Sequence, residues 1–164
     1  MSGSGVDAPR FLADAMLGRL ARWLRVLGWD TRYEPEIPDA RLVTIANAEE
    51  RVLLTRDRGL LRDLRPVRAL DVTRDEPLLQ LVDVVAALAL TAPAELFTRC
   101  LVCNVPLIDV PPDEATLVVP PAAVGLPGPV RRCPSCGRVY WYGSHARRMR
   151  VALEAVLGDW LARR

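Results

Sequence analysis

Strand-like and helix-like spacings alternate between residues 10 and 90. Short segments with strand character occupy residues 10–13, 31–33, 52–55 and 67–72. Apolar residues three and four positions apart predict helices over residues 17–27, from 38–39 through 46, at 60–64, and over 75–90. Strands that alternate with helices in this way are typical of a parallel α/β sheet, and this is the fold class that we expect.

The pattern changes near residue 98, where prolines become frequent and paired cysteines appear. Because proline disrupts helices, we expect short strands and turns, and no helix, around Pro111, Pro112, Pro120, Pro121, Pro127 and Pro129. A last helix is predicted over 144–161, with Met149, Leu153, Val156 and Leu157 on one side. We therefore divide the chain into a flexible leader (1–9), an α/β domain (10–97), a cysteine-bearing segment (98–142) and a C-terminal helix packed on the body (143–164).

Composition and charge narrow the function classes. The chain has 164 residues, of which 51% are hydrophobic and 26% charged, so it can form a sizeable core and disorder is disfavoured. Its longest apolar stretch, 78–90, is interrupted by Gln80 and Asp83, so no membrane span is expected. No secretory signal opens the sequence, and we expect a cytoplasmic protein.

Charge is unevenly distributed along the chain. Residues 1–130 contain 14 arginines and 18 acidic residues, whereas residues 131–164 contain 8 arginines and 2 acidic residues. An acidic body with a basic tail fits a metal site beside a surface that binds a polyanion. An ordinary solvated, arginine-rich helix is the alternative.

All four cysteines lie in two C-x-x-C pairs, Cys100/Cys103 and Cys133/Cys136, with 29 residues between the pairs. Such pairs place four thiolates on turns that can converge on one Zn²⁺ ion. Redox chemistry or disulfides are the alternative, which the two pairs and the missing secretory signal disfavour. Because four thiolates leave no open coordination position, the zinc is expected to be structural, with about one ion per chain.

Three carboxylates, Asp14, Asp39 and Asp57, stand where apolar segments end or helices begin. Ligands of parallel α/β folds collect beyond the carboxyl ends of the strands. A Mg²⁺ or Mn²⁺ ion would allow acids that meet there to stay ionised, and it could activate water against a phosphodiester. Helix capping is the alternative for Asp14 and Asp39. Asp30, a candidate turn residue, and Asp75, a candidate cap, are second-line candidates.

Several segments in one order resemble the Mut7-C ribonuclease domain family. They are FLADAMLGRLARWLR (11–25), LLTRDR (53–58), RCLVCN (99–104), RCPSCGRVYW (132–141), GSH (143–145) and RM (148–149). The resemblance covers roughly residues 10–150. It implies a PIN-like nuclease fold, a parallel sheet flanked by helices, followed by a small zinc ribbon and a C-terminal helix. It also implies RNA cleavage with Mg²⁺ or Mn²⁺ held by acidic residues.

The resemblance carries over residue by residue. Asp14 matches the acid of the first strand, Asp57 matches the acid of the Thr-Arg-Asp motif, and Asp39 matches the acid that opens the preceding helix. PIN-like sites usually add a fourth acid, to which no position here plainly corresponds. PIN-like relatives often dimerise, so a homodimer is compatible with the resemblance.

Basic and aromatic residues are candidate RNA contacts. Arg19, Arg22 and Arg25, at steps of three, are expected on one solvent-facing side of the helix after Asp14, and Arg56 and Arg58 flank Asp57. These side chains would hold phosphates, or they form solvated surfaces. The run 140–142, Tyr-Trp-Tyr, would stack on bases or pack the ribbon.

The single histidine, His145, is a candidate for proton transfer, with a hydrogen bond at the start of its helix as the alternative. Two functions therefore remain. The first is a Mg²⁺- or Mn²⁺-dependent ribonuclease, and the alternative is a non-catalytic zinc-ribbon module that binds RNA or protein.

Overall fold

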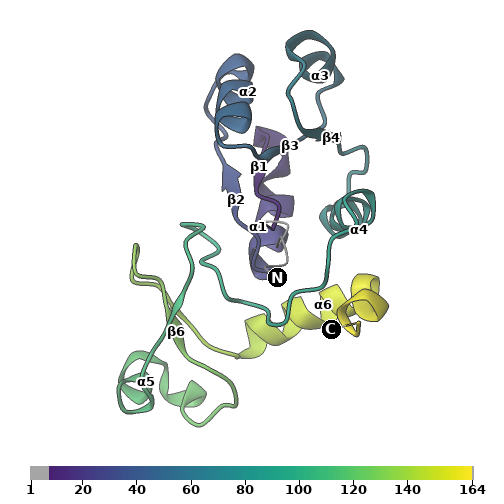
Figure 1. Cartoon of the computed structure of the whole chain (residues 1–164). Helices are drawn as coiled ribbons and strands as arrows, with labels where there is room; N and C mark the ends of the chain where they lie inside the picture. The colour runs from purple at the N-terminus through teal and green to yellow at the C-terminus, as the bar shows by residue number, and fades with distance from the viewer. Residues whose placement is uncertain (1–7, 164) are drawn as a thin grey trace, which may run out of the picture.

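The computed structural model describes residues 8–163, which contain a four-stranded parallel sheet (Figure 1). The strands are β1 (Phe11–Ala13), β2 (Thr31–Tyr33), β3 (Val52–Thr55) and β4 (Ala69–Asp71). Their order is β2-β1-β3-β4, and every pair of neighbours is parallel. The predicted α/β class is therefore confirmed. Residues 1–7 of the expected leader lie outside the described residues.

Helices cover both faces of this sheet. They are the 3-10 helix η1 (Ala15–Leu17), α1 (Gly18–Val26), α2 (Asp39–Ala48), α3 (Arg58–Leu64) and α4 (Pro77–Ala87). Side chains alternate along a strand, so Phe11 and Ala13 share one core with α1 and α4. Leu12 and Leu53 share a second core with α2 and α3 on the opposite face. The sheet is thus the middle one of three layers.

The chain changes direction at β1. From β1 it passes through α1 to β2 on one side, and from β2 it passes through α2 on the other face to β3, which lies on the other side of β1. In open α/β sheets such a reversal opens a crevice beyond the carboxyl ends of the two central strands. The ends of β1 and β3 are therefore where a ligand site is expected.

The cysteine-bearing segment contains a small antiparallel sheet of order β5-β6-β7, and the second cysteine pair lies between β6 and β7. Its strands are β5 (Ile108–Asp109), β6 (Arg131–Arg132) and β7 (Val139–Tyr140). The expectation of no helix around the prolines is wrong, since α5 (Pro112–Val118) and the 3-10 helix η2 (Pro121–Ala123) both begin at a proline. The fixed φ of proline suits the first turn of a helix, and Asp113 and Glu114 favour the same end of α5.

The C-terminal helix α6 (Ser144–Leu161) lies beside α4, while β6 and α5 occupy a lobe far from α2 and α3 (Figure 1). Met149, Leu153, Leu157 and Leu161 of α6 are buried in the core that contains α1 and α4. Val156, which the sequence analysis expected on this side of the helix, is partly buried against the same core. Within residues 8–163, none of the helices combines the length and apolar character that a membrane crossing requires.

Candidate active site and metal centre

Asp14 and Asp57 meet at the carboxyl ends of β1 and β3. The backbone N–H of Asp14 donates to the Leu54 carbonyl at 3.0 Å, which fixes the end of β1 against β3. The buried hydroxyl of Thr55 donates to Asp14 Oδ2 at 2.7 Å and accepts from the Asp57 N–H at 2.9 Å. Thr55, which the sequence analysis missed, therefore joins the Asp14 carboxylate to the backbone of Asp57.

Both carboxylates also cap helices. Asp14 Oδ1 accepts from the Ala15 N–H at 2.5 Å, and Asp57 Oδ1 accepts from the Leu60 N–H at 3.0 Å. Capping uses one oxygen of each group, and Asp57 Oδ2 has no hydrogen-bond donor within residues 8–163. Capping therefore fixes the orientation of the Asp57 carboxylate and leaves an oxygen for a ligand.

Asp71 is a further acid at this edge of the sheet. It ends β4 and stands opposite Thr55 in the strand register. Arg58 donates to Asp71 at 3.1 Å, and Arg56 donates to the exposed Asp75 at 2.5 Å. Arg56 and Arg58, two of the five arginines predicted to bind RNA, therefore pair with acids in this structure. The sequence analysis missed Asp71 because it lies inside the predicted strand 67–72, not after it.

The third predicted ligand, Asp39, is the exposed first residue of α2. No hydrogen bond or ion pair joins its carboxylate to another residue of the range 8–163. In that range, the four cysteines are the only group of three or more acids, cysteines or histidines whose ligand atoms all lie within 4.8 Å of one another. The structure thus brings Asp14 and Asp57 together and leaves Asp39 outside their contact.

Tyr33 and Gly18 pack against each other close in space to the residues that follow Asp14. The Tyr33 hydroxyl donates to the Ala15 carbonyl at 2.8 Å. A Cβ atom on Gly18 would lie 2.8 Å from Tyr33 Cζ, closer than real atoms approach. The glycine that begins α1 therefore allows the Tyr33 ring to lie against the start of this helix and to reach the Ala15 carbonyl in η1.

Two of the predicted arginines on α1 are exposed. Arg19 has no hydrogen-bond or ion-pair partner within the described part of the chain, and the Arg22 guanidinium lies 3.3 Å from His145 Nε2. His145 is the second residue of α6 and is itself exposed. The contact therefore joins the helix that follows Asp14 to the start of α6.

Arg25 does not share this exposed surface, and the expectation that it faces solvent is wrong. It is only 8% exposed. Its guanidinium donates to the carbonyls of Thr31, Leu101 and Val102 at 2.9, 2.8 and 3.2 Å. Leu101 and Val102 lie between the first two cysteines, so Arg25 fixes the cysteine-bearing segment to α1 and β2 and is not available to RNA.

Replacing Arg25 by methionine is expected to lower the free energy of unfolding by about 3 kcal/mol, because one buried and two partly buried carbonyls lose a charged donor while the apolar volume is kept. Urea unfolding followed by circular dichroism measures this. Arg19→Met, on the exposed side of the same helix, is the matched control and should change stability by less than about 0.5 kcal/mol. Equal stability of the two variants would contradict the bracing role of Arg25.

Asp30, a second-line candidate for the carboxylate site, does not lie at the edge of the sheet where Asp14 and Asp57 lie. It precedes β2, so it lies at the amino edge of the sheet, opposite Asp14. Arg51 donates to it at 2.7 Å, as does the Asn104 amide. Burial alone would raise the pKa of Asp30, but hydrogen bonds from Arg51 and Asn104 hold it below its usual value. Asp30 therefore links the sheet to the residue that follows Cys103.

The four cysteines converge as the sequence predicts. All four sulfurs lie within 4.8 Å of one another, and Cys100 Sγ is 3.8 Å from Cys136 Sγ. Four sulfurs about 2.3 Å from a tetrahedral zinc ion are separated by about 3.8 Å. Soft thiolate ligands in this arrangement suit Zn²⁺. The cluster could therefore hold zinc, with all four positions filled by protein.

Each C-x-x-C turn supports its first sulfur in the same way. The Cys103 N–H points to Cys100 Sγ at 3.3 Å, and the Cys136 N–H points to Cys133 Sγ at 3.4 Å. The residue after each turn, Asn104 or Gly137, has a positive φ of 63° or 73°. Glycine adopts this conformation without strain, and asparagine is among the residues that tolerate it.

Cys100 is the best-supported thiolate of the cluster. Burial would raise its pKa, but the Cys103 N–H and the Tyr140 hydroxyl, 3.2 Å from its sulfur, lower the pKa to about 6. The pKa of Cys103 is raised to about 12, chiefly by the side chain of Cys136. Without a cation the Cys103 thiol therefore keeps its proton, and a divalent ion is what would allow it to act as a thiolate ligand beside Cys100.

We compared the chain with known proteins and with models of protein families. The chain matches no curated protein and no solved structure at a significant level. The family model described as the Mut7-C RNAse domain matches residues 9–153, which include the Asp14–Asp57 site and all four cysteines. On this match, the chain belongs to the Mut7-C RNAse domain family.

Proposed function

We propose that this chain is a ribonuclease that depends on Mg²⁺ or Mn²⁺, with a structural Zn²⁺ ion on its four cysteines. The observation that carries the proposal is the pairing of Asp14 and Asp57 through Thr55 at the reversal point of the sheet. Substrates of open α/β folds bind at this place. Membership of an RNase-domain family supports RNA as the substrate.

Asp14 and Asp57 would hold the catalytic cation. Carboxylate oxygens are the hard ligands that Mg²⁺ and Mn²⁺ prefer, and Asp57 keeps one oxygen without a donor. The exposed Asp39 and the partly buried Asp71 lie on elements that begin or end at the same edge of the sheet and are candidates to complete the ligand set. A bound cation would supply Lewis-acid activation of the phosphodiester and of the attacking water.

The protein's own residues would orient the RNA. Thr55 fixes the Asp14 carboxylate, and the cap to Leu60 fixes that of Asp57, so neither group has to reorganise when substrate binds. Arg19 and Arg22 project from α1, the helix that follows Asp14, and would hold phosphates of the bound strand. Arg56 and Arg58 pair with Asp75 and Asp71 and would screen the negative charge around the site.

The test is cleavage of mixed single-stranded RNA by the full-length protein. Cleavage is expected with millimolar Mn²⁺ or Mg²⁺ and is expected to fall at least about a hundredfold when free divalent ions are removed by gel filtration. Gel filtration is preferable to EDTA, which could also remove zinc from the cysteines. Zinc content should be measured in parallel so that loss of fold is not mistaken for loss of activity.

Two results would contradict the proposal. Cleavage that is unchanged without divalent ions would exclude the cation mechanism. RNA binding without cleavage under any of these conditions would favour the alternative, a zinc-ribbon module whose aspartates serve only as helix caps.

A further inference from the structure

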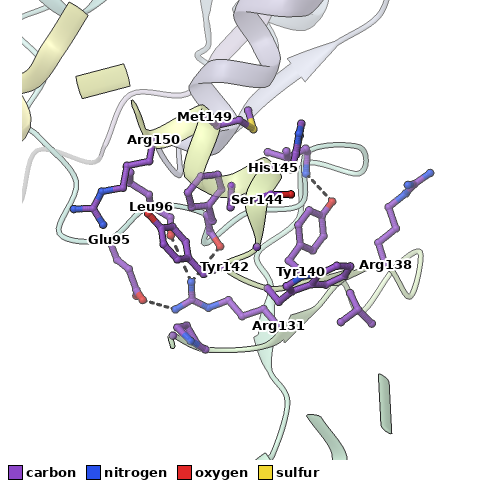
Figure 2. Close-up of a pocket in the computed structure, with 18 of the residues that line it drawn as sticks. Glu95, Leu96, Arg131, Arg138, Tyr140, Tyr142, Ser144, His145, Met149 and Arg150 are labelled. Carbon is purple, nitrogen blue, oxygen red and sulfur yellow. Dashed lines mark hydrogen bonds and ion pairs between the residues drawn. The ribbon is translucent and has the colours of Figure 1, made fainter. Parts of the chain in front are cut away.

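A cavity of about 850 Å³ lies between α1, β7 and the start of α6 (Figure 2), and its lining includes neither Asp14 nor Asp57. Its lining comes from four parts of the chain: Arg22 on α1, residues 94–97, the turn between the first two cysteines, and residues between 127 and 150, from before β6 into α6. The volume falls within the range of about 300–1,000 Å³ that is typical of small-ligand pockets. The proposed catalytic site does not use this cavity.

The charge of the lining favours an anion. Arg22, Arg131, Arg138 and Arg150 line the cavity, and Glu95 is its only acidic residue. Figure 2 shows Glu95 bound to Arg131, and this pair neutralises the one negative charge. Arg138 has no partner for its guanidinium within residues 8–163 and is exposed. Arg150 pairs with Glu154 outside the lining, so the positive charge without an acidic partner comes from Arg138 and Arg22, and this charge suits a phosphate.

The start of α6 adds to this charge. Gly143, Ser144 and His145 line the cavity, and the first N–H groups of this 18-residue helix have no side-chain cap. The first turn of α6 contains no acidic residue. Free N–H groups and the positive end of the helix dipole are favourable for an anion that already has arginine contacts.

Aromatic side chains provide surfaces for a base. Trp141 and Tyr142 line the cavity and are only partly buried, and the Trp141 indole N–H has no hydrogen-bond partner in the described range. A Cβ atom on Gly143 would lie 2.7 Å from Trp141 Nε1. Glycine at this position therefore allows the indole ring to lie against the start of α6. Aromatic faces beside arginine are typical of sites that stack single-stranded bases.

Arg22 connects the cavity with the catalytic site. It lines the cavity and contacts His145, while it stands on the helix that follows Asp14. Asp14 and Arg22 are separated by η1 and the first half of α1, roughly 14 Å along the helix axis. Arg19, exposed one turn before Arg22, lies between them. A strand of RNA could thus pass from the aspartates along α1 to the cavity.

We propose that this cavity binds one nucleotide of single-stranded RNA, with its base on Trp141 and its phosphate held by Arg138 and the start of α6. The inference rests on the proposed function for the identity of the ligand. It adds a binding site for a nucleotide away from the bond that is cut. Single-stranded RNA is favoured over a duplex because only an unpaired base can stack on a ring inside a cavity.

The test is binding of a fluorescein-labelled single-stranded RNA octamer to the full chain carrying Asp57→Asn, measured by fluorescence anisotropy. Adding Trp141→Ala is expected to weaken binding roughly tenfold through the lost stacking contact. Adding Arg138→Gln is expected to reduce the salt dependence of binding by about one counterion. Arg163→Gln, beyond the far end of α6 and roughly 27 Å away along its axis, is the control of equal charge.

A second pair of variants tests the shape of the cavity without removing a ring or a charge. Gly143→Ala should displace the Trp141 ring and weaken binding about fivefold or more, within the range of a stacking contact. Gly158→Ala, on the same helix with no atom within 4 Å of the added methyl group, should leave binding unchanged. If Trp141→Ala does not fold, the glycine pair and Arg138→Gln still decide the matter.

The outcomes separate this inference from the proposed function. Unchanged RNA affinity in Trp141→Ala, Arg138→Gln and Gly143→Ala would overturn the cavity site, even if the wild-type chain cleaves RNA. No RNA binding by the Asp57→Asn chain would also overturn it. Weakened binding in these variants would support the cavity site, even if the wild-type chain does not cleave.

Discussion

Replacing Asp57 by asparagine is expected to lower the rate of RNA cleavage at least about a hundredfold while the protein stays folded. The amide oxygen of asparagine can still accept the Leu60 N–H, so the cap of α3 is kept. The negative charge is lost, and with it a cation contribution of several kcal/mol to the transition state. Initial cleavage rates at saturating Mn²⁺ measure the effect, and thermal unfolding checks the fold.

Asp113→Asn is the matched control for this substitution. Asp113 is an exposed acid in the first turn of α5, on the lobe far from the sheet, so cleavage should be unchanged. Asp39→Asn, made in the same way, measures whether the first residue of α2 takes part. An Asp57→Asn chain that cleaves within about twofold of wild type, still dependent on Mn²⁺, would show that Asp57 only caps its helix.

The sheet was predictable because its central strands are buried on both faces. β1 and β3 lie in the middle of the order, and their apolar runs therefore appear uninterrupted in the sequence. β4 was predicted over 67–72 but spans only Ala69–Asp71, with Val67 79% exposed. This strand pairs on one side only, so its apolar residues are not all required by the core.

The approach of Asp14 and Asp57 also followed from sequence, since parallel strands bring their carboxyl ends to one edge. The side chain that connects them, Thr55, could not be predicted from the sequence. Thr55 is part of an apolar run, and nothing local distinguishes a buried threonine that bridges two acids from one that only fills a strand. Such a role depends on the register of β1 against β3, which sequence spacing does not determine.

The misplacement of Arg25 has a geometrical cause. A step of three residues turns an α-helix by about 300°, so each successive arginine is rotated back by about 60°. Arg25 therefore lies about 120° around α1 from Arg19, at the border of the apolar side. A regular spacing of three predicts neighbours along a helix but not one shared face, and the burial of Arg25 depends on a tertiary partner, the turn at Leu101 and Val102.

The same contacts join the cysteine cluster to the sheet. Asn104 accepts from the Thr31 N–H at 2.9 Å and donates to Asp30, and Arg25 reaches from α1 to the turn between Cys100 and Cys103. Tyr140 of β7 contacts both the Cys100 sulfur and the Leu101 N–H. The cluster thus lies where the two halves of the chain meet, and its order supports both the body and the cavity beside Trp141.

Replacing Cys100 by serine is accordingly expected to remove the bound zinc and to lower the melting temperature by more than about 10 °C. A structural zinc site contributes folding free energy directly, and a serine hydroxyl is a poor substitute for a thiolate. In a chain of this size, about 3–5 kcal/mol corresponds to a shift of roughly that extent. Elemental analysis of the purified protein and calorimetry measure the two effects, with about one zinc per chain expected for the wild type.

Val102→Ser is the matched control for this substitution, because it places serine in the same turn at a side chain that is 56% exposed. It should keep the zinc and the melting temperature. If the Cys100→Ser chain melts like the wild type and the wild type contains no metal, the cluster does not depend on zinc for its structure. If zinc is lost but the sheet still melts at the wild-type temperature, the contacts of Arg25 and Asn104 do not transmit the order of the cluster to the body. An effect on both quantities is expected, since these contacts connect the first C-x-x-C turn to β2 of the parallel sheet and to β7 of the antiparallel sheet.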